Sequence, residues 1–556
     1  MKTSLILFIN FLALAKAGIL VKIPDGRLRG RIEHSSRNIS FFAFQQIPYA
    51  KPPIGKLRFK DPIPVDKWNG VLDATKNTKF CYQQTNLYNV QNLSRFENED
   101  CLYLNVYTPV DPSSNASLPV MFYIYGGGFV SGASNFEFFG PHYLMENGVV
   151  VVTINYRVGP FGFISTGDAV IPGNFGLKDQ LLGLHWVRDN IAYFGGDPNK
   201  VTIFGQSAGG ASVGFHLISR KSKGLFRAAI SQSASILSPW AYQRIYKALA
   251  YRVAFYIDNN FDKASTSEEL LKFLQDAPAS EINKAGRDIP SGYEQITDGF
   301  LYTPVIEAES ETAFITERMF SALENGHFNR VPLIIGICSE ESITTASNME
   351  DFLKRVKQFD EDVSKLVNPN MHIEDKEGEI PAGNAIRNIY TNGTLLQNNL
   401  GKAVRYYSDT SFSRGVIEHA QLQSKFSDVY FYQFSYYGKI IGDRPNVPGA
   451  ARTGHSDDNY FIWATGNLTN LDSFPRSDVV TSERYRALFT NFAKYLDPIP
   501  EETKLLNVKW PKVHPDKFQY IDINETLTIK INPKGDVFPE WVDVYNKYAI
   551  KPYDTF

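Results

Sequence analysis

One short stretch, residues 201–209, constrains the fold of this chain more than any other. A β-branched, apolar run leads into Gly-Gln-Ser-Ala-Gly, and small residues that can open a packed helix follow. A sharp turn from strand to helix would strain the backbone of Ser207 and bring its neighbours two residues away almost into contact, which favours glycine at both places. The pattern predicts a nucleophile elbow, with the Ser207 hydroxyl at the top of a sheet and the Ala208 N–H free to bind an oxyanion. Because such a motif also occurs by chance in about one of five chains this long, the interpretation depends on partners for Ser207.

Continuous apolar runs elsewhere predict strands that are buried on both faces. Two of them occupy residues 118–124 and 149–154, and a helical apolar stripe over residues 177–191 separates the second run from the elbow. Further candidates for central strands are residues 226–230, 331–335 and 429–434. The sequence therefore predicts an α/β fold with a mostly parallel central sheet covered by helices, in which charged helical segments such as 266–274 form long insertions. With no repeat, low-complexity tract or linker, we expect a single domain over residues 18–556.

The N-terminus has the layout of a secretory signal peptide. Lys2 precedes an apolar run at residues 5–14, and a small-x-small site ends at Ala17, so we expect residues 1–17 to be removed. The run is too short for a spanning helix, and neither a later apolar stretch nor the C-terminal sequence predicts a membrane anchor. The protein is therefore expected to be secreted and extracellular. Acceptor sequons for glycosylation fit that route and begin at Asn38, Asn92, Asn115, Asn392, Asn467 and Asn524.

Charge and cysteine content narrow the function further. A formal net charge of −2 over 556 residues argues against nucleic-acid binding. In an oxidising compartment two of the three cysteines should pair, and Cys81 and Cys101 are nearest to each other in the sequence. Cys338 would then be an odd thiol, which its apolar neighbours predict to be buried and inert.

A serine nucleophile needs a base, which near neutral pH is usually histidine. His455 lies in a glycine-rich loop after the last strong strand candidate, although a surface histidine with acidic neighbours is the alternative. The acid is expected between the two, after a strand that follows the elbow. Residues 331–335 run into Glu340 and Glu341, and either carboxylate can hold the tautomer of an imidazole. Spacing alone does not separate these two acids, and both can instead be solvated loop residues.

The residues after the first strand candidate predict an oxyanion loop. Tyr125 is followed by three glycines, 126–128, which let the main chain approach a substrate carbonyl without obstruction by side chains. Their position after an early strand and before the elbow is where hydrolases of this architecture have their second donor loop. A merely flexible turn is the alternative.

In combination, these motifs resemble the type-B carboxylesterase family, the cholinesterase-like branch of the α/β-hydrolases, over nearly all of the mature chain. Further matching segments are residues 47–59, 99–107, 155–157, 194–198 and 230–233. The resemblance implies the α/β-hydrolase fold, hydrolysis of a small-molecule carboxylic ester, no metal or cofactor, and a disulfide between Cys81 and Cys101. It also implies two buried structural ion pairs, Arg58 with Glu99 and Arg157 with Asp179.

Position by position, the resemblance assigns roles to individual residues. It implies Ser207 as nucleophile, Glu341 rather than Glu340 as acid, and His455 as base. It implies that the oxyanion donors are the N–H groups of Gly127, Gly128 and Ala208.

Several positions depart from the family pattern. Tyr125 stands where histidine is usual, and Gln206 stands where glutamate is common. Gln206 is similar to the juvenile-hormone-esterase-like branch, whereas Gly210 stands where that branch usually has alanine. Ser342 and Ala234 each replace an expected glycine. An insect-type carboxylesterase and a juvenile-hormone-esterase-like enzyme are therefore both consistent with the sequence.

The residues predict a secreted serine esterase that forms an acyl-enzyme, with juvenile hormone, pheromone, xenobiotic and dietary esters all open as substrates. No tryptophan lies between Cys81 and Cys101 to receive a quaternary ammonium, so a choline ester is not expected. Trp240 is expected either to line the acyl side of the site or to belong to the core. The rival interpretation is a non-catalytic adhesion or binding protein on the same fold. Its known members commonly lose triad residues, whereas this chain keeps all three. The oligomeric state is left open.

Overall fold

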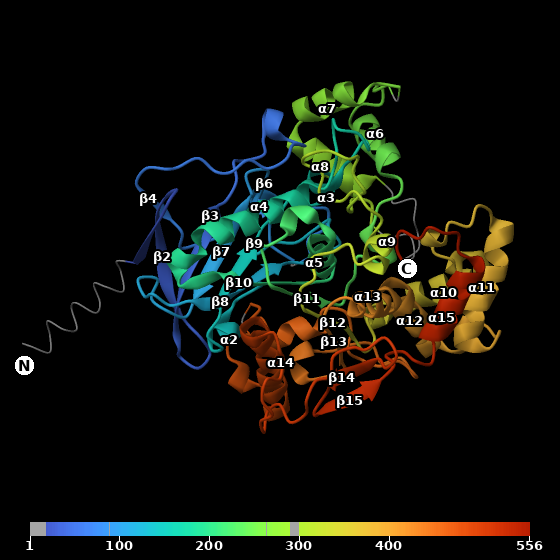
Figure 1. Cartoon of the computed structure of the whole chain (residues 1–556). Helices are drawn as coiled ribbons and strands as arrows, with labels where there is room; N and C mark the ends of the chain where they lie inside the picture. Colours follow the sequence, from blue (N-terminus) through green and yellow to red (C-terminus); the bar gives the residue numbers. More distant parts are fainter. Residues whose placement is uncertain (1–17, 88, 263, 290–299, 467) are drawn as a thin grey trace, which may run out of the picture.

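The computed structural model describes residues 18–556 except 88, 263, 290–299 and 467. Within this part of the chain, a 13-stranded sheet runs through the molecule in the order β1-β2-β3-β7-β9-β8-β10-β11-β12-β13-β14-β15, with β4 paired to β2 (Figure 1). The strands are β1 (Ile19–Ile23), β2 (Gly26–His34), β3 (Ser40–Pro48), β4 (Val71–Asp73), β7 (Tyr103–Thr108), β8 (Leu118–Ile124), β9 (Val150–Ile154), β10 (Gly196–Gln206), β11 (Ala228–Gln232), β12 (Leu333–Cys338), β13 (Val429–Phe434), β14 (Gln519–Ile523) and β15 (Leu527–Ile531). A separate two-stranded sheet pairs β5 (Phe80–Cys81) with β6 (Glu97–Asn98).

The helices are mostly connections between these strands and insertions beyond them. They are α2 (His142–Met145), α3 (Gly159–Phe163), α4 (Phe175–Asn190), α5 (Ala208–Ile218), α6 (Tyr246–Ile257), α7 (Ser267–Asp276), α8 (Ala279–Asp288), α9 (Met319–Glu324), α10 (Met349–Glu361), α11 (Lys376–Thr391), α12 (Leu400–Ser408), α13 (Arg414–Ser424), α14 (Arg476–Tyr495) and α15 (Phe538–Tyr548). A π-helical turn, Asp409–Ser413, joins α12 to α13.

The centre of the sheet is parallel and fully covered, as the apolar runs predict. Every neighbouring pair from β9 through β8, β10, β11, β12 and β13 to β14 is parallel. All residues of β9, β11 and β12 are buried. Strands with helices on both sides bury both faces, which is why these segments carry continuous rather than alternating apolar residues. The predicted α/β architecture with a mostly parallel central sheet is therefore confirmed.

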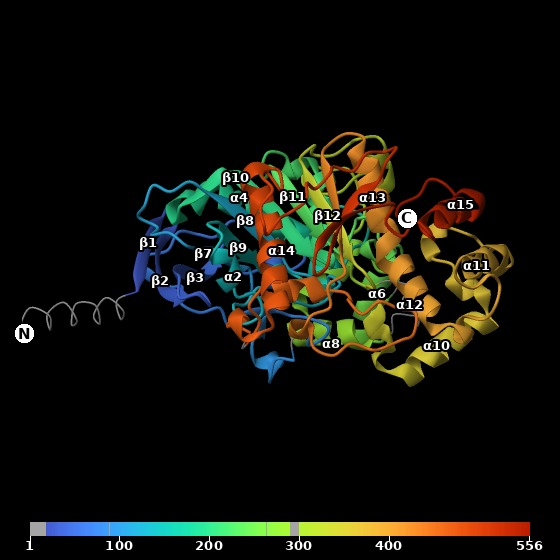
Figure 2. The same cartoon turned by 90° about the horizontal axis from the view of Figure 1, so that it is seen from below.

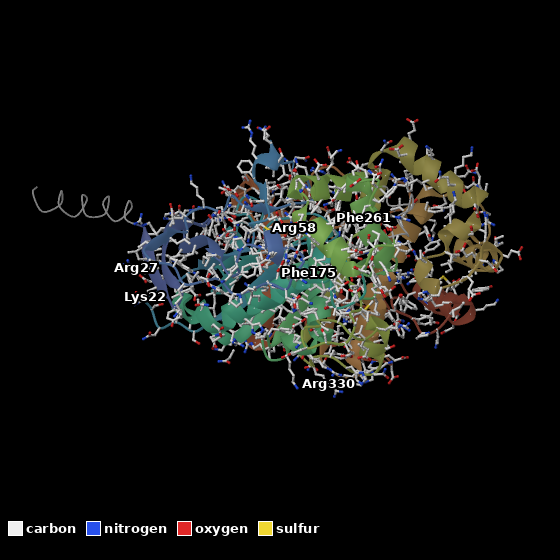
Figure 3. The ribbon with its side chains drawn as sticks, turned by 90° about the horizontal axis from the view of Figure 1, so that it is seen from above. Lys22, Arg27, Arg58, Phe175, Phe261 and Arg330 are labelled. Atoms are coloured by element: carbon white, nitrogen blue, oxygen red, sulfur yellow. A yellow bond between two sulfur atoms is a disulfide. The ribbon has the colours of Figure 1, made fainter. Side chains whose placement is uncertain are left out.

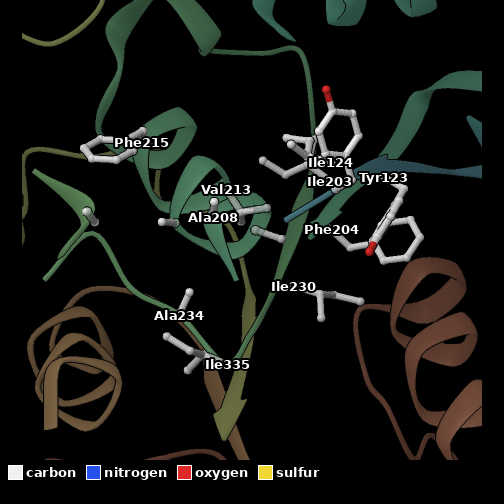
Figure 4. Close-up of a cluster of buried hydrophobic side chains, with 14 of the residues drawn as sticks. Tyr123, Ile124, Ile203, Phe204, Ala208, Val213, Phe215, Ile230, Ala234 and Ile335 are labelled. Carbon is white, nitrogen blue, oxygen red and sulfur yellow. The ribbon is translucent and has the colours of Figure 1, made fainter. Parts of the chain in front are cut away.

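Helices cover the two faces of the central strands. Figure 1 shows α5 on one side of β10 and β11, and α14 on the other. In the close-up of Figure 4, Ala208 and Val213 of α5 lie among the apolar residues of the strands, such as Ile203 and Ile230. In both Figure 1 and Figure 2, α10, α11 and α15 gather at the end of the molecule away from β1 and β2. The part of the chain that the structure describes contains no helix long and apolar enough to cross a membrane.

The two ion pairs that the resemblance implies are both present and largely withdrawn from solvent. Arg58, which is labelled in Figure 3, donates two hydrogen bonds of 2.6 and 2.7 Å to Glu99. It also donates to the carbonyl of Ala277 beyond α7. Arg157 donates to Asp179 of α4 at 2.7 and 2.8 Å. Because each pair is bidentate and buried, removing one partner would leave a charge without compensation.

Candidate active site

Ser207 lies in a strained turn between β10 and α5. Its backbone angles are φ 58° and ψ −128°, and its N–H donates to the carbonyl of Gln232 at 2.9 Å. A Cβ on Gly205 would lie 2.5 Å from the carbonyl carbon of Gly209, and one on Gly209 would lie 1.9 Å from the carbonyl oxygen of Ile124. Glycine is therefore required at both positions, because backbone atoms occupy the space that a side chain would need. The turn leaves Ser207 partly exposed at the end of a buried strand.

His455 and Glu341 meet although they are far apart in the sequence. The Nδ1 of His455 lies 2.7 Å from Oε2 of Glu341, and the His455 backbone N–H donates to the Glu341 carbonyl at 2.9 Å. The other oxygen of the Glu341 carboxylate accepts from the N–H of Cys338 at 2.7 Å, and the side chain is fully buried. Because a carboxylate can only accept a hydrogen bond, Nδ1 carries the ring proton and donates it to Glu341, and Nε2 of His455 is left as the acceptor.

Glu340, which spacing alone did not separate from Glu341, has different partners. Its carboxylate accepts from the Ser408 hydroxyl at 2.8 Å and from the N–H of Ala451 at 3.2 Å, and it pairs with Arg405 at 3.4 Å. Both acids are buried, but only Glu341 contacts His455.

The Nε2 side of His455 faces the residue before the nucleophile. Its Nε2 lies 3.2 Å from the side-chain nitrogen of Gln206, and the ring of Phe412 lies against the imidazole with centroids 4.3 Å apart. In the part of the chain that the structure describes, the side chain of His455 contacts Gln206 and Glu341, and the hydroxyl of Ser207 makes no hydrogen bond to it. Hydrogen bonds of catalytic groups often form only when substrate is bound, so a contact of His455 with Gln206 in the absence of substrate is compatible with a later one to Ser207.

The glycine loop lies directly against the elbow. Gly127 and Gly128 have φ values of 108° and 65°, and a Cβ on Gly126 would lie 2.8 Å from the Cβ of Ser207. No described residue accepts a hydrogen bond from the N–H of Gly127, Gly128 or Ala208. Three backbone N–H groups beside Ser207 are therefore available to a bound oxyanion, one of them at the N-terminus of α5.

A buried acid next to this site has no clear signal in the sequence. Asp458 accepts hydrogen bonds from Tyr485 at 2.6 Å, Gln232 at 3.0 Å and Tyr432 at 3.2 Å. Burial raises the pKa of Asp458, and its hydrogen bonds partly oppose that shift. The network ties the loop of His455 to the end of β11, where the Gln232 carbonyl receives the Ser207 N–H. In the sequence, Asp457 and Asp458 stand side by side shortly after His455, and no neighbouring residue indicates which of them lies in the site.

Aromatic side chains form one wall beside His455. Phe412 comes from the π-helical turn, and the ring of Trp240 packs 5.9 Å from it and 6.0 Å from Phe300. Trp240 is buried and donates to the carbonyl of Ser411 at 2.7 Å, whereas Phe300 is 42% exposed. Trp240 therefore lies behind Phe412, one ring away from His455.

Cys81 and Cys101 form a disulfide with an S–S distance of 2.08 Å, and the segment after Cys81 supports the glycine loop. The N–H of Gln84 donates to Val130 at 2.9 Å. The hydroxyls of Thr85 and Ser131 lie 2.7 Å apart, and the side chain of Gln83 accepts from the N–H of Gly132 at 3.1 Å.

The remaining predicted features are distributed over the surface and the core. Cys338 is a buried free thiol whose pKa is raised by burial. Residues 1–17 and Asn467 lie outside the described part of the chain. Among the described residues, no group of His, Cys, Asp and Glu side chains is arranged to hold a metal ion. The other candidate glycosylation sites are exposed, namely Asn38, Asn92, Asn115, Asn392 and Asn524.

Two other histidines have serine and glutamine partners but lie inside the protein. His216 contacts Ser222 at 2.8 Å and Gln180 at 3.1 Å, and burial lowers its pKa to about 3. His419 contacts Ser235 at 2.9 Å and Gln423, and burial lowers its pKa to about 4. Both are fully buried and neutral, so they are structural.

Comparisons with known proteins show which family this chain resembles over most of its length. The family model described as the carboxylesterase family matches residues 17–541. The chain is 34% identical to a juvenile hormone esterase of Tribolium castaneum over 532 residues, which cover 91% of this chain and 88% of that one. It is 33% identical to venom carboxylesterase-6 of Apis mellifera over 523 residues, 91% of this chain and 90% of that one. The crystal structure of juvenile hormone esterase from Manduca sexta, with OTFP covalently attached, superposes with a TM-score of 0.83 at 26% identity and covers 95% of this chain and 99% of that one.

Proposed function

This chain belongs to the carboxylesterase family, has the α/β-hydrolase fold and is a carboxylic ester hydrolase, and we propose that it cleaves esters through Ser207, His455 and Glu341. The observation that carries the proposal is the contact of 2.7 Å between His455 and Glu341 beside a strained serine. This contact supplies an oriented base next to a partly exposed hydroxyl, which is what a serine nucleophile requires.

In the proposed reaction, His455 exchanges its contact with Gln206 for one with Ser207 as the ester enters. Nε2 takes the proton of the Ser207 hydroxyl while its oxygen attacks the carbonyl carbon, and Glu341 stabilises the imidazolium that forms. The N–H groups of Gly127, Gly128 and Ala208 donate to the oxyanion of the tetrahedral intermediate. His455 then protonates the departing alcohol, and water hydrolyses the acyl-enzyme by the same route.

The location and the substrate are further parts of the proposal. We propose a single domain over residues 18–556 that is secreted after removal of residues 1–17, which the five exposed sequons support. The aromatic wall of Phe412, Trp240 and Phe300 supports an ester with an apolar acyl group, because it offers no charge to a polar one. Juvenile hormone, pheromone, xenobiotic and dietary esters are the candidates, and the names of two similar proteins favour testing juvenile hormone first.

The test is a substrate profile of the purified mature protein. A panel of esters that varies acyl and alcohol size is assayed beside Ser207→Ala as the blank, and an organophosphate is used to label the active serine. We expect hydrolysis by the wild type only, with the label on Ser207 by peptide mass spectrometry. Absence of both hydrolysis and labelling would reject the catalytic proposal and favour a non-catalytic adhesion or binding protein on this fold.

A further inference from the structure

Two tyrosines stand where the oxyanion loop leaves the sheet. Tyr125 directly follows β8 and precedes the three glycines, and Tyr156 follows β9 by one residue. The two strands are parallel neighbours in which Ile124 pairs with Ile154, so both tyrosines emerge at the same edge of the sheet. Neither has been given a role in the reaction above.

The two tyrosines hold each other reciprocally. The hydroxyl of Tyr156 donates to the carbonyl of Tyr125 at 2.9 Å, and the hydroxyl of Tyr125 donates to the carbonyl of Tyr156 at 3.0 Å. Their rings are stacked with centroids 4.4 Å apart and planes at 18°, and both side chains are fully buried. Because both tyrosines are buried, each of these hydrogen bonds is stronger than at the surface and is costly to lose.

The carbonyl that Tyr156 holds belongs to the first peptide plane of the oxyanion loop, the plane that joins Tyr125 to Gly126. Three consecutive glycines restrict their own φ and ψ angles only weakly, because they have no Cβ. The direction of their N–H groups therefore depends on contacts at the ends of the loop. At the far end, the N–H groups of Val130 and Ser131 donate to the Gly127 carbonyl at 3.1 and 3.0 Å. At the near end, the Tyr156 hydroxyl fixes the carbonyl of Tyr125.

The loop also has little freedom to move toward the nucleophile. A Cβ on Gly126 would lie 2.6 Å from the carbonyl oxygen of Gln206, and a Cβ on Gly209 would lie 2.8 Å from that of Tyr125. Backbone therefore packs on backbone between the loop and the elbow. A small rotation of the first peptide plane would turn the N–H groups of Gly127 and Gly128 away from the oxyanion.

We propose that Tyr156 is a positioning residue for catalysis: its hydroxyl holds the Tyr125 carbonyl and so aims the oxyanion donors of the glycine loop. This inference rests on the proposed function, since it assigns a task within the same reaction. The Tyr125 hydroxyl makes the reciprocal hydrogen bond, but its acceptor is the carbonyl of Tyr156, which lies outside the oxyanion loop.

This asymmetry provides a matched pair of variants. Tyr156→Phe and Tyr125→Phe each remove one oxygen from the same stack and take the donor from one buried carbonyl. Tyr125→Phe also removes the acceptor of the Tyr156 backbone N–H, a contact of 3.4 Å, so we expect it to lose at least as much thermal stability as Tyr156→Phe. Tyr156→Phe should lower kcat about ten-fold with KM unchanged within about two-fold, because the lost interaction acts on the transition state. Tyr125→Phe should keep kcat within about three-fold of the wild type.

A second readout separates aiming from general support. A trifluoromethyl ketone forms a tetrahedral adduct with the serine and carries the oxyanion, so Tyr156→Phe should weaken its binding by the factor seen in kcat/KM. Active-site titration with an organophosphate expresses kcat per folded site. Should Tyr156→Phe fail to fold, 4-aminophenylalanine and 4-methylphenylalanine at position 156 replace it. Both fill the volume, and only the first, which retains a donor, should keep the wild-type kcat.

The inference is overturned if the donor-free variant at position 156 keeps the wild-type kcat, if both tyrosine variants lose kcat equally, or if ketone binding does not change. The wild type in the same ester assay separates this outcome from the function itself. An inactive wild type overturns the proposed function and the inference with it, whereas an active wild type with an unaffected Tyr156→Phe overturns the inference alone.

Discussion

Exchanging the two neighbouring glutamates for glutamine, one at a time, gives the sharpest test of the triad. The Glu341 carboxylate accepts at both oxygens, from the Cys338 N–H and from Nδ1 of His455, each at 2.7 Å. Glutamine has the same shape but offers one acceptor and one donor group. Glu341→Gln therefore cannot satisfy both partners.

The size of the effect follows from the two orientations of that amide. If its oxygen faces Cys338, its NH₂ faces Nδ1 and places the imidazole proton on Nε2, the nitrogen that must accept from Ser207. The opposite orientation sets two N–H groups against each other, at a cost of about 1–3 kcal/mol for the buried N–H left without an acceptor. Either way the imidazolium loses a charged partner, worth about 4 kcal/mol at an effective dielectric constant of about 20, which also describes buried sites. Together these effects come to about 5–7 kcal/mol, or roughly a 10⁴- to 10⁵-fold loss of kcat at 1.36 kcal/mol per factor of ten.

The assay is the steady-state hydrolysis of the best ester from the substrate panel, with kcat expressed per organophosphate-titrated site and folding followed by circular dichroism. Glu340→Gln is the control, because Glu340 is equally buried but holds Arg405 and Ser408 instead of His455. We expect Glu340→Gln to lower the melting midpoint while keeping kcat per site. Near-normal kcat in Glu341→Gln, or a larger loss in Glu340→Gln, would refute the assignment of the acid.

Three further predictions address stability, specificity and pH dependence. Replacing Cys81 and Cys101 by serine opens a loop with a sequence separation of 20 and should cost about 3 kcal/mol in urea unfolding; an unchanged midpoint would contradict this. Phe412→Ala opens space beside Trp240 and should raise the ratio of kcat/KM for long over short acyl esters about ten-fold, so an unchanged ratio would show that this wall does not face the acyl group. Burial lowers the pKa of His419 from 6.5 to about 4, so between these values the unfolded chain binds a proton that the folded chain does not. The contribution of His419 to stability is then full above pH 6.5 and falls by about 1.4 kcal/mol per pH unit down to about pH 4. His419→Gln should reduce the slope of unfolding free energy against pH in this range, and an unaltered slope would count against a neutral buried histidine.

The sequence predicts the fold well where local chemistry determines it. Parallel strands covered on both faces need continuous apolar runs, so 118–124 and 429–434 coincide with β8 and β13. The ends of the predicted strands are wrong where a residue departs from the continuous apolar pattern. The run at 331–335 becomes β12 only from Leu333, after Pro332, which has no N–H to donate to a ladder. The strand predicted at 226–230 instead runs to Gln232, whose polar side chain is buried because it binds Asp458.

In the candidate site, too, residues that local chemistry determines can be predicted from the sequence, whereas residues that long-range contacts determine cannot. The elbow around Ser207 is visible in the sequence because its turn demands glycine. The choice between Glu340 and Glu341 depends on contacts with residues 65 to 114 positions away, so neither composition nor spacing contains it. The contact of Gln206 with His455 and the reciprocal tyrosine pair likewise join segments that only the fold brings together.

The disulfide gives the oxyanion loop a second support, and this links catalysis to the place where the chain folds. Gln83 and Thr85 follow Cys81 closely and hold Gly132 and Ser131, just beyond the three glycines. In a reducing cytosol Cys81 and Cys101 would remain thiols. Ser207, Glu341 and His455 could still meet, but the glycine loop would keep the Tyr156 contact at its start and lose the support of the disulfide at its end. Production in an oxidising compartment and production in a reducing one should therefore yield enzymes that bind the same esters but differ in turnover.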